Sequence, residues 1–271
     1  MDRISKAIEL AKAKGASLGN SEPKFRRPIP IEPPTEAQNY IPLANAQLDE
    51  KHLETQRIIA HQTAHPAVAA FDVLRTSLLQ EMDANGWQTL AISSPTASCG
   101  KTVLAVNLAL SMARVPDRRV ILIDLDLRRP RVASYLGLNQ ANGLFQVLSG
   151  QAPLKACLTN ISIASSQLSV LANQNPVSNP AEVIGSKEMK NLLVQIKSDS
   201  RKPILIVDTA PVLACDDVLA LLPRLDCILL AVAERQSTAA DVTSCERLLQ
   251  SANYLGLVLT KSSEQTESYY Y

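Results

Sequence analysis

Short apolar runs alternate with helix-like segments along most of the chain. Runs rich in β-branched and apolar residues, each short enough for a buried strand, lie at 87–93, 119–124, 168–172, 203–208, 226–233 and 254–260. Apolar positions at helical spacing predict helices at 66–82, 103–113, 181–198, 216–222 and 237–251, with shorter ones at 131–135, 143–148 and 153–158. This alternation predicts a doubly wound, mainly parallel α/β sheet with helices on both faces.

The first fifty residues follow a different pattern. In residues 1–18, Ile4, Ala7, Ile8 and Ala11 share one face of an expected amphipathic helix. Residues 19–50 are polar and rich in proline, which predicts an extended linker. We expect the folded domain at 51–263 and a tyrosine-rich tail at 264–271.

The composition indicates a globular protein and argues against a nucleic-acid binder. The 271 residues are 46% hydrophobic, enough for a sizeable core, and the formal net charge of +1 gives no sign of a nucleic-acid binder. No run approaches the roughly 20 apolar residues of a membrane span, and the first residues lack the apolar core of a signal peptide. We therefore expect a cytoplasmic protein that reaches a membrane only through a partner.

A Gly-Lys-Thr sequence separates the first apolar run from the helix that follows it. Strand, loop and helix in this order are the context of a phosphate-binding P-loop, in which backbone N–H groups and the helix dipole face a polyphosphate. We expect Lys101 to reach the terminal phosphates and Thr102 to ligate Mg²⁺. Pro95 stands where the usual motif begins with glycine. The predicted nucleotide contacts are Ser98, Cys99, Gly100, Lys101, Thr102 and Val103.

Two other expected strands end in aspartates. Asp124 and Asp126 belong to a D-x-D-x-R element that includes Arg128, and Asp208 ends a later strand. Because ligands bind beyond the carboxyl ends of parallel strands, we expect the three carboxylates to converge on the P-loop. There the three carboxylates would bind Mg²⁺ together with Thr102. The carboxylates would also supply the general base. Arg128 would stabilise developing charge or clamp a phosphate.

These motifs resemble those of the bacterial tyrosine kinases (BY-kinases) of capsular and exopolysaccharide synthesis. The resemblance covers about residues 66–271, and the D-x-D-x-R element is its most discriminating mark. It implies a P-loop NTPase fold and a protein-tyrosine autokinase that uses ATP and Mg²⁺, with Lys101, Asp124, Asp126, Arg128 and Asp208 as catalytic residues. It also implies three partners: a membrane polysaccharide co-polymerase that regulates chain length, further copies of the chain, and a protein-tyrosine phosphatase. The kinase would then lie in the cytoplasm, peripheral to the inner membrane.

The sequence ends in Tyr269, Tyr270 and Tyr271. Core packing does not explain three phenols at a terminus, where chains are usually mobile. They suit phosphate acceptors that reach the active site of a neighbouring chain, where each phosphate adds roughly −1.5 to −2 charges. The alternative is a tail that packs against an apolar surface.

The sequence departs from the family pattern in three respects. Ser98 replaces a P-loop glycine, Ala210 replaces a proline, and only Arg75 matches the assembly motif E-x-x-R-x-x-R, whose other positions are Ala69 and Asp72. Because the loop and the assembly motif are altered, a second hypothesis is a nucleotide-bound scaffold without kinase activity. A third is a positioning ATPase of the ParA/MinD type, although Thr96 stands at the position of the signature lysine of that class.

Overall fold

The computed structural model describes residues 44–62, 65–139, 142–163 and 166–263. The described residues all belong to one compact unit. The predicted N-terminal helix, most of the predicted linker and the tyrosine-rich tail lie outside the described residues. None of the helices described is long and apolar enough to cross a membrane.

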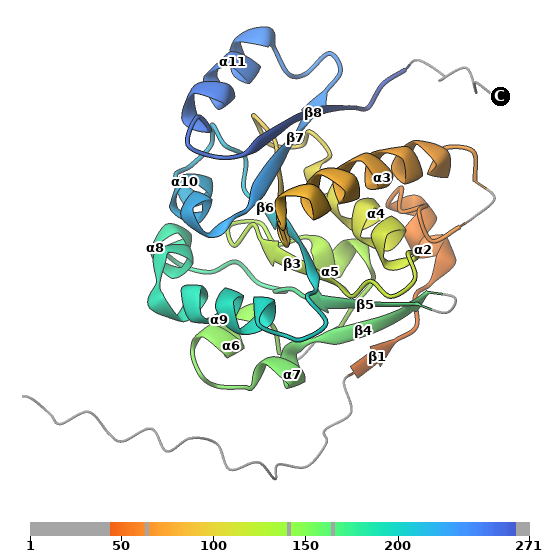
Figure 1. Cartoon of the computed structure of the whole chain (residues 1–271), viewed down its shortest axis with the longest axis vertical. Helices are drawn as coiled ribbons and strands as arrows, with labels where there is room; N and C mark the ends of the chain where they lie inside the picture. The colour runs from red at the N-terminus through yellow and green to blue at the C-terminus, as the bar shows by residue number, and fades with distance from the viewer. Residues whose placement is uncertain (1–43, 63–64, 140–141, 164–165, 264–271) are drawn as a thin grey trace, which may run out of the picture. The chain divides into compact units, whose positions relative to one another are not determined.

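Within these ranges, eight strands form one sheet in the order β1-β4-β5-β3-β6-β2-β7-β8 (Figure 1). Each neighbouring pair is parallel except β4 and β5. The predicted mainly parallel sheet is therefore confirmed. The strands are β1 (Ala44–Ala46), β2 (Thr89–Ser93), β3 (Val120–Leu125), β4 (Thr159–Ile163), β5 (Ser166–Leu171), β6 (Ile204–Thr209), β7 (Cys227–Ala233) and β8 (Tyr254–Thr260).

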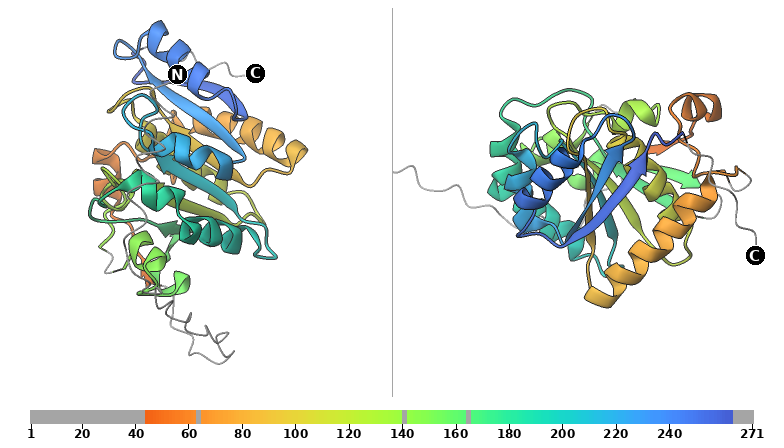
Figure 2. Two further views of the ribbon diagram at one scale, coloured as in Figure 1. Left: turned by 90° about the vertical axis from the view of Figure 1, so that its left-hand side faces the viewer. Right: turned by 90° about the horizontal axis from the view of Figure 1, so that it is seen from above.

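Helices cover both faces of this sheet (Figures 1 and 2). One face carries α2 (Glu50–Thr55), α3 (Val68–Asn85), α4 (Lys101–Ala113) and α5 (Val132–Tyr135). The other carries α6 (Leu144–Leu148), α7 (Leu154–Cys157), α8 (Pro180–Gly185), α9 (Lys187–Lys197), α10 (Asp217–Leu221) and α11 (Ala239–Leu248).

Strand β3 shows why the apolar runs are continuous. Its side chains point alternately to the two faces. Val120 and Leu122 join the core under α3 and α4, whereas Ile121, Ile123 and Leu125 join the core under α6 to α9. Both faces are buried, so every position is apolar up to the point where the strand reaches the site.

One predicted boundary needs correction, and one strand was not predicted. Residues 44–50, which fell in the predicted linker, form β1, which pairs with β4, and the first residue of α2. Strand β4 itself, Thr159–Ile163, was not predicted. A three-residue edge strand and a polar antiparallel strand carry too little apolar periodicity to be recognised before their pairing partners are known.

The helix that would carry the assembly motif is tied to its own domain. Arg75 Nη1 donates to Asp72 Oδ1 at 2.9 Å and to the backbone oxygen of Ser111 at 3.3 Å, and Arg114 also contacts Asp72. These bonds join α3 to α4.

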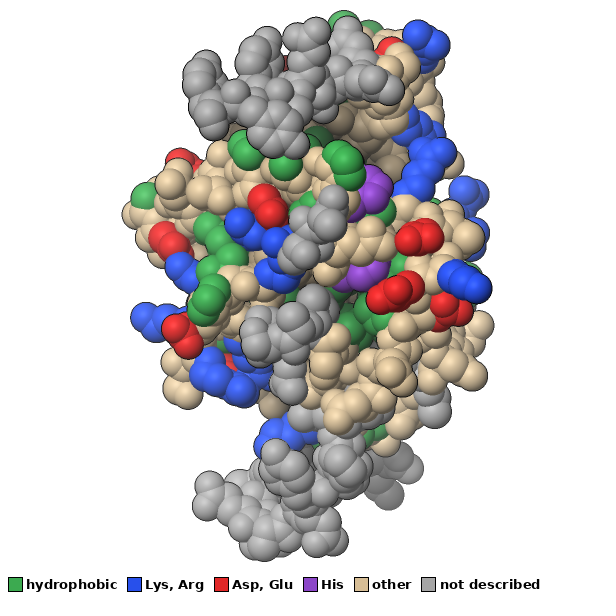
Figure 3. All heavy atoms as spheres, turned by 90° about the vertical axis from the view of Figure 1, so that its right-hand side faces the viewer, with side chains coloured by type: hydrophobic (Ala, Val, Ile, Leu, Met, Phe, Trp, Pro, Cys, Tyr) green, Lys and Arg blue, Asp and Glu red, His purple; other side chains and the backbone are tan. Residues whose placement is uncertain are grey.

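On the face shown in Figure 3, the described acidic and basic side chains are interspersed, in keeping with the small net charge.

Asp226 links three elements at the start of β7. Its carboxylate accepts hydrogen bonds from the backbone N–H groups of Gln88 and Thr89 and from Lys197 Nζ, all at 2.8 Å. Partial burial opposes ionisation, but the bonds from Lys197 and Gln88 outweigh it and lower the pKa of Asp226 below its ordinary value.

We predict that Asp226→Asn lowers the free energy of unfolding by about 2 kcal/mol at pH 7, because the charge-assisted bonds are lost. Since the folded pKa lies below the unfolded one, the stabilisation is present above about pH 4 and disappears as the pH falls through the folded pKa. Urea unfolding at pH 7 and pH 3 should show the difference from wild type shrinking in acid. Asp117→Asn, at an exposed position, is the control; a deficit that is equal at both pH values would contradict the prediction.

Candidate functional site

The loop between β2 and α4 turns sharply at two positions. Ser98 has φ 63° and Gly100 has φ 84°, both in the left-handed region. Glycine adopts this conformation without cost, whereas a residue with a Cβ is strained. Ser98, which replaces a glycine of the family's P-loop, therefore occupies a position that favours glycine.

Residues far along the chain hold this loop from outside. Thr260 Oγ1, at the end of β8, donates to the backbone oxygen of Cys99 at 2.6 Å, and Gln236 Nε2 donates to that of Ala97 at 2.7 Å. The Cys99 thiol lies 3.5 Å from Ser237 Oγ. No local sequence signal marks these supports, since they lie more than 130 residues away from the loop.

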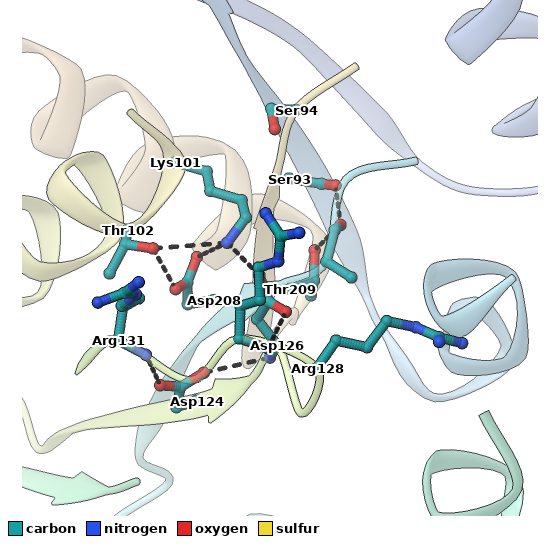
Figure 4. Close-up of polar contacts among 12 residues, drawn as sticks. Ser93, Ser94, Lys101, Thr102, Asp124, Asp126, Arg128, Arg131, Asp208 and Thr209 are labelled. Atoms are coloured by element: carbon teal, nitrogen blue, oxygen red, sulfur yellow. Dashed lines mark hydrogen bonds and ion pairs between the residues drawn. The ribbon is translucent and has the colours of Figure 1, made fainter. Parts of the chain in front are cut away.

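Lys101 lies among acidic side chains from the neighbouring strands (Figure 4). Its Nζ is 2.6 Å from Asp126 Oδ2 and 3.6 Å from Asp208 Oδ1. Thr102 Oγ1 donates to Asp208 Oδ2 at 2.6 Å. The structure thus brings together the four predicted residues Lys101, Thr102, Asp126 and Asp208 at the carboxyl ends of β2, β3 and β6.

Asp124 has a different set of partners. Its Oδ2 accepts from the backbone N–H groups of Arg131 and Val132, both at 2.9 Å, and its Oδ1 accepts from that of Asp126 at 3.1 Å. These bonds fix the turn that carries Asp126 beyond the end of β3. Asp124 therefore supports the position of Asp126 through the backbone.

The cluster places three buried carboxylates, Asp124, Asp126 and Asp208, against one ammonium. Burial and the charge of Asp208 raise the pKa of Asp124, and burial also raises that of Asp208 despite the nearby Lys101. Burial opposes the charge on Lys101, but Asp208 and Asp126 outweigh it and raise its pKa. The site therefore keeps Lys101 charged, whereas Asp124 and Asp208 are hard to ionise together, and a further cation would favour their ionised forms.

The oxygens present fit a hard cation such as Mg²⁺ at one point. Asp208 Oδ1 is buried and has no hydrogen-bond partner among the described residues, with Lys101 Nζ 3.6 Å away, and Thr102 Oγ1 donates to the other oxygen of the same carboxylate. Hydroxyl and carboxylate oxygens are the ligands that Mg²⁺ prefers. No three acidic, histidine or cysteine side chains in the described ranges form a ready-made metal site, since Asp124 is bound by backbone N–H groups and Asp126 by Lys101.

Arg128 does not join the cluster. Its side chain points away from Lys101 in Figure 4 and makes a two-pronged ion pair with Asp217, from Nε at 2.8 Å and from Nη2 at 3.0 Å. Asp217 is only 1% exposed, whereas Arg128 is 46% exposed. Arg128 therefore anchors the D-x-D-x-R turn to α10. It does not lie where the predicted phosphate clamp would be.

Comparison with known proteins agrees with this geometry. A family model described as the ParA, or NUBPL iron-transfer, P-loop NTPases matches residues 87–258, more than half of the chain. The chain belongs to this family of P-loop NTPases. Such a fold binds a nucleotide, typically with a divalent metal. Iron transfer is a property of the family members that carry that name.

Within the P-loop NTPases, the relatives of this chain are bacterial tyrosine kinases. The tyrosine-protein kinase Ptk of Acinetobacter johnsonii is 32% identical over 151 residues, 56% of this chain and 20% of Ptk. Etk of Escherichia coli K12 is 30% identical over 198 residues, 72% of this chain and 27% of Etk. The chain therefore spans less than a third of the length of these two relatives.

A solved structure confirms the predicted resemblance. The kinase domain of Escherichia coli Etk superposes with a TM-score of 0.66 at 29% identity, covering 77% of this P-loop NTPase and 82% of the Etk domain. The BY-kinase resemblance and the P-loop fold are thus both confirmed. The individual contacts of residues 98–103 with a nucleotide stay predictions.

We predict that Ser98→Gly raises the free energy of unfolding by about 1 kcal/mol, because it relieves a left-handed backbone at a residue with a Cβ. The neighbouring change Ala97→Gly is the matched control, since Ala97 is not among the left-handed positions. Ala97→Gly should not raise the free energy of unfolding. Thermal unfolding of the three chains measures the effect, and equal responses of the two variants would refute the assignment of strain to Ser98.

Proposed function

We propose that this chain is a protein-tyrosine kinase that transfers the γ-phosphate of ATP, with Mg²⁺, to Tyr269, Tyr270 and Tyr271 of a neighbouring copy. The observation that carries the proposal is the 2.6 Å contact between Lys101 Nζ and Asp126 Oδ2. It places a second strand-end carboxylate beside the P-loop lysine, in addition to Asp208. The relationship to tyrosine kinases supports the same conclusion.

The contacts suggest a division of duties among the three aspartates. Thr102 and Asp208 would hold Mg²⁺, which offsets the charge of the phosphates. Lys101 would leave Asp126 for the phosphate, and this would free the Asp126 carboxylate to act as general base. Asp124, bound by three backbone N–H groups, would position Asp126.

The transfer is a single displacement. The phenolic oxygen of a tyrosine forms a bond to the γ-phosphorus, and the bond from that phosphorus to the bridging oxygen breaks. ADP retains the electron pair of the broken bond, and the phenolic proton passes to Asp126.

The cellular setting follows from the family resemblance. We infer a cytoplasmic kinase, held at the inner membrane by a polysaccharide co-polymerase and reset by a protein-tyrosine phosphatase. Cycles of phosphorylation would regulate the polymerisation and export of an exopolysaccharide. The added negative charge on the tail would loosen its contact with the acidic cluster of another chain.

Intact-mass analysis after incubation with Mg²⁺ and ATP tests the transfer. We expect successive additions of phosphate on the wild-type tail, and a rate at least about 100-fold lower in Lys101→Ala because the phosphates lose their cation. Lys155→Ala, at an exposed helical lysine, should behave as wild type. Turnover of ATP without any mass gain would favour the positioning ATPase, and nucleotide binding without turnover would favour the scaffold.

A mixture of two inactive variants tests transfer between chains. Lys101→Ala keeps the tail but lacks the phosphate contact, whereas a chain with all three tail tyrosines changed to Phe keeps the site but lacks acceptors. Phosphate on the Lys101→Ala chain in the mixture is expected. Its absence, together with phosphorylation of the wild type, would show transfer within one chain instead.

A further inference from the structure

A cavity of about 450 Å³ lies between the start of α6 and the loop that follows β5. We call it the amide pocket, because its lining includes five carboxamide side chains and one aromatic ring. These residues are Asn142, Phe145, Gln146, Asn173, Gln174 and Asn175. Its volume lies within the range of about 300–1,000 Å³ that is typical of ligand sites.

Backbone contacts hold the walls of the pocket together. Leu144 N donates to the backbone oxygen of Ala172, and a Cβ on Gly143 would lie only 2.1 Å from that oxygen. Only glycine therefore lets the two segments meet. Asn173 Oδ1 accepts from Phe145 N at 3.0 Å, which joins the walls a second time. A site that is formed in advance loses little conformational entropy when a ligand binds.

The pocket is separate from the carboxylate cluster. None of its lining residues, all of which are described, belongs to the group around Lys101. One bond links the two regions, since Val177 N in the pocket wall donates to the backbone oxygen of Leu127 at 2.9 Å. Leu127 lies in the D-x-D-x-R turn, so this bond fixes the outer wall of the pocket to a rigid part of the fold.

The lining favours an uncharged ligand. The described lining residues include no lysine, arginine, histidine, aspartate or glutamate. A phosphate or carboxylate in the pocket would lose its hydration without meeting a cation, which costs free energy. The chemistry of the pocket therefore argues against nucleotides and acidic peptides.

The carboxamides keep both donors and acceptors for a ligand. Gln146 uses its Oε1 to accept from Gly143 N at 2.9 Å, and Gln174 uses its Nε2 to donate to Asn139 Oδ1 at 3.2 Å. The Nε2 group of Gln146 and the Oε1 group of Gln174 remain for a ligand, and Asn175 is exposed. Because a hydroxyl group both donates and accepts, a ligand with several hydroxyl groups can bond to all of these carboxamides.

The ring of Phe145 adds an apolar surface to this polar lining. Phe145 is 40% exposed although it is a large apolar residue. The face of an aromatic ring is partly negative and attracts the partly positive hydrogens of C–H groups. A pyranose ring has such C–H groups on its faces and hydroxyl groups around its edge. Most ligand pockets are chiefly apolar with a few polar groups, so the many carboxamides here favour a saccharide over a lipid or a flat aromatic ligand.

We propose that the amide pocket binds a neutral saccharide. The C–H face of one pyranose ring would pack against Phe145, and its hydroxyl groups would bond to Gln146, Gln174 and Asn175. This inference goes beyond the proposed phosphate transfer and does not depend on it. The chain would recognise carbohydrate directly, at a site beside its kinase centre.

Saturation-transfer NMR on the full chain without ATP tests the pocket. The probes are the methyl glycosides of glucose, galactose, mannose and N-acetylglucosamine. We expect at least one of them to bind with a Kd on the order of 1 mM, because one ring contact and a few neutral hydrogen bonds hold it. Phe145→Ala should weaken this binding about tenfold and Asn175→Ala about threefold, whereas Phe145→Tyr, which keeps the ring, should bind as wild type does.

Leu248→Ala is the matched control. Leu248 is an apolar residue with a similar exposure, 42%, but it lies on α11, which is at the opposite end from α6 in Figure 1. Its loss should not change the affinity. Phe145 and Asn175 are themselves exposed, so their variants should keep the thermal unfolding midpoint of the wild type within a few degrees.

Three results would overturn the proposal. The first is that none of the four glycosides binds to the wild type. The second is equal glycoside affinity in the wild type and Phe145→Ala. The third is that adenosine, an uncharged nucleoside, binds more tightly than every glycoside and loses its affinity in Phe145→Ala, because the pocket would then be a nucleoside site.

Discussion

One buried ammonium among three buried carboxylates is the constraint on which the site depends. Burying an unpaired charge costs several kcal/mol, so Lys101 needs Asp126 and Asp208, and they need Lys101. Burial still raises the pKa of Asp124 and of Asp208, so the carboxylates are hard to ionise together. That arrangement suits a site that takes up a divalent cation, because the added positive charge would favour the ionised carboxylates.

The topology of the sheet brings these charged side chains together. Strands β2, β6 and β3 are neighbours although they are distant in sequence, so Thr102, Asp208 and Asp126 meet at one edge. The surrounding structure then fixes their directions. Backbone N–H groups hold Asp124, Asp217 holds Arg128, and Thr260 holds the P-loop from the far end of the chain.

The sequence predicted what repeats with a regular period or lies in a short motif. The strands of the parallel core, the helix at Lys101 and the convergence of Asp126 and Asp208 all followed from apolar runs and strand ends. Strands β1 and β4 were missed because their pairing, not their composition, makes them strands. Arg128 was placed at the phosphate because the motif does not reveal Asp217, which is 89 residues away.

A crystal structure of the chain with Mg²⁺ and ADP would show whether Lys101 exchanges its carboxylate partner for a phosphate. We expect Lys101 Nζ to leave Asp126 for a phosphate oxygen, and the metal ion to contact Thr102 Oγ1 and Asp208. Asp124 would keep its three backbone hydrogen bonds. A structure in which Lys101 remains on Asp126 while the phosphates bind elsewhere would contradict the proposed exchange.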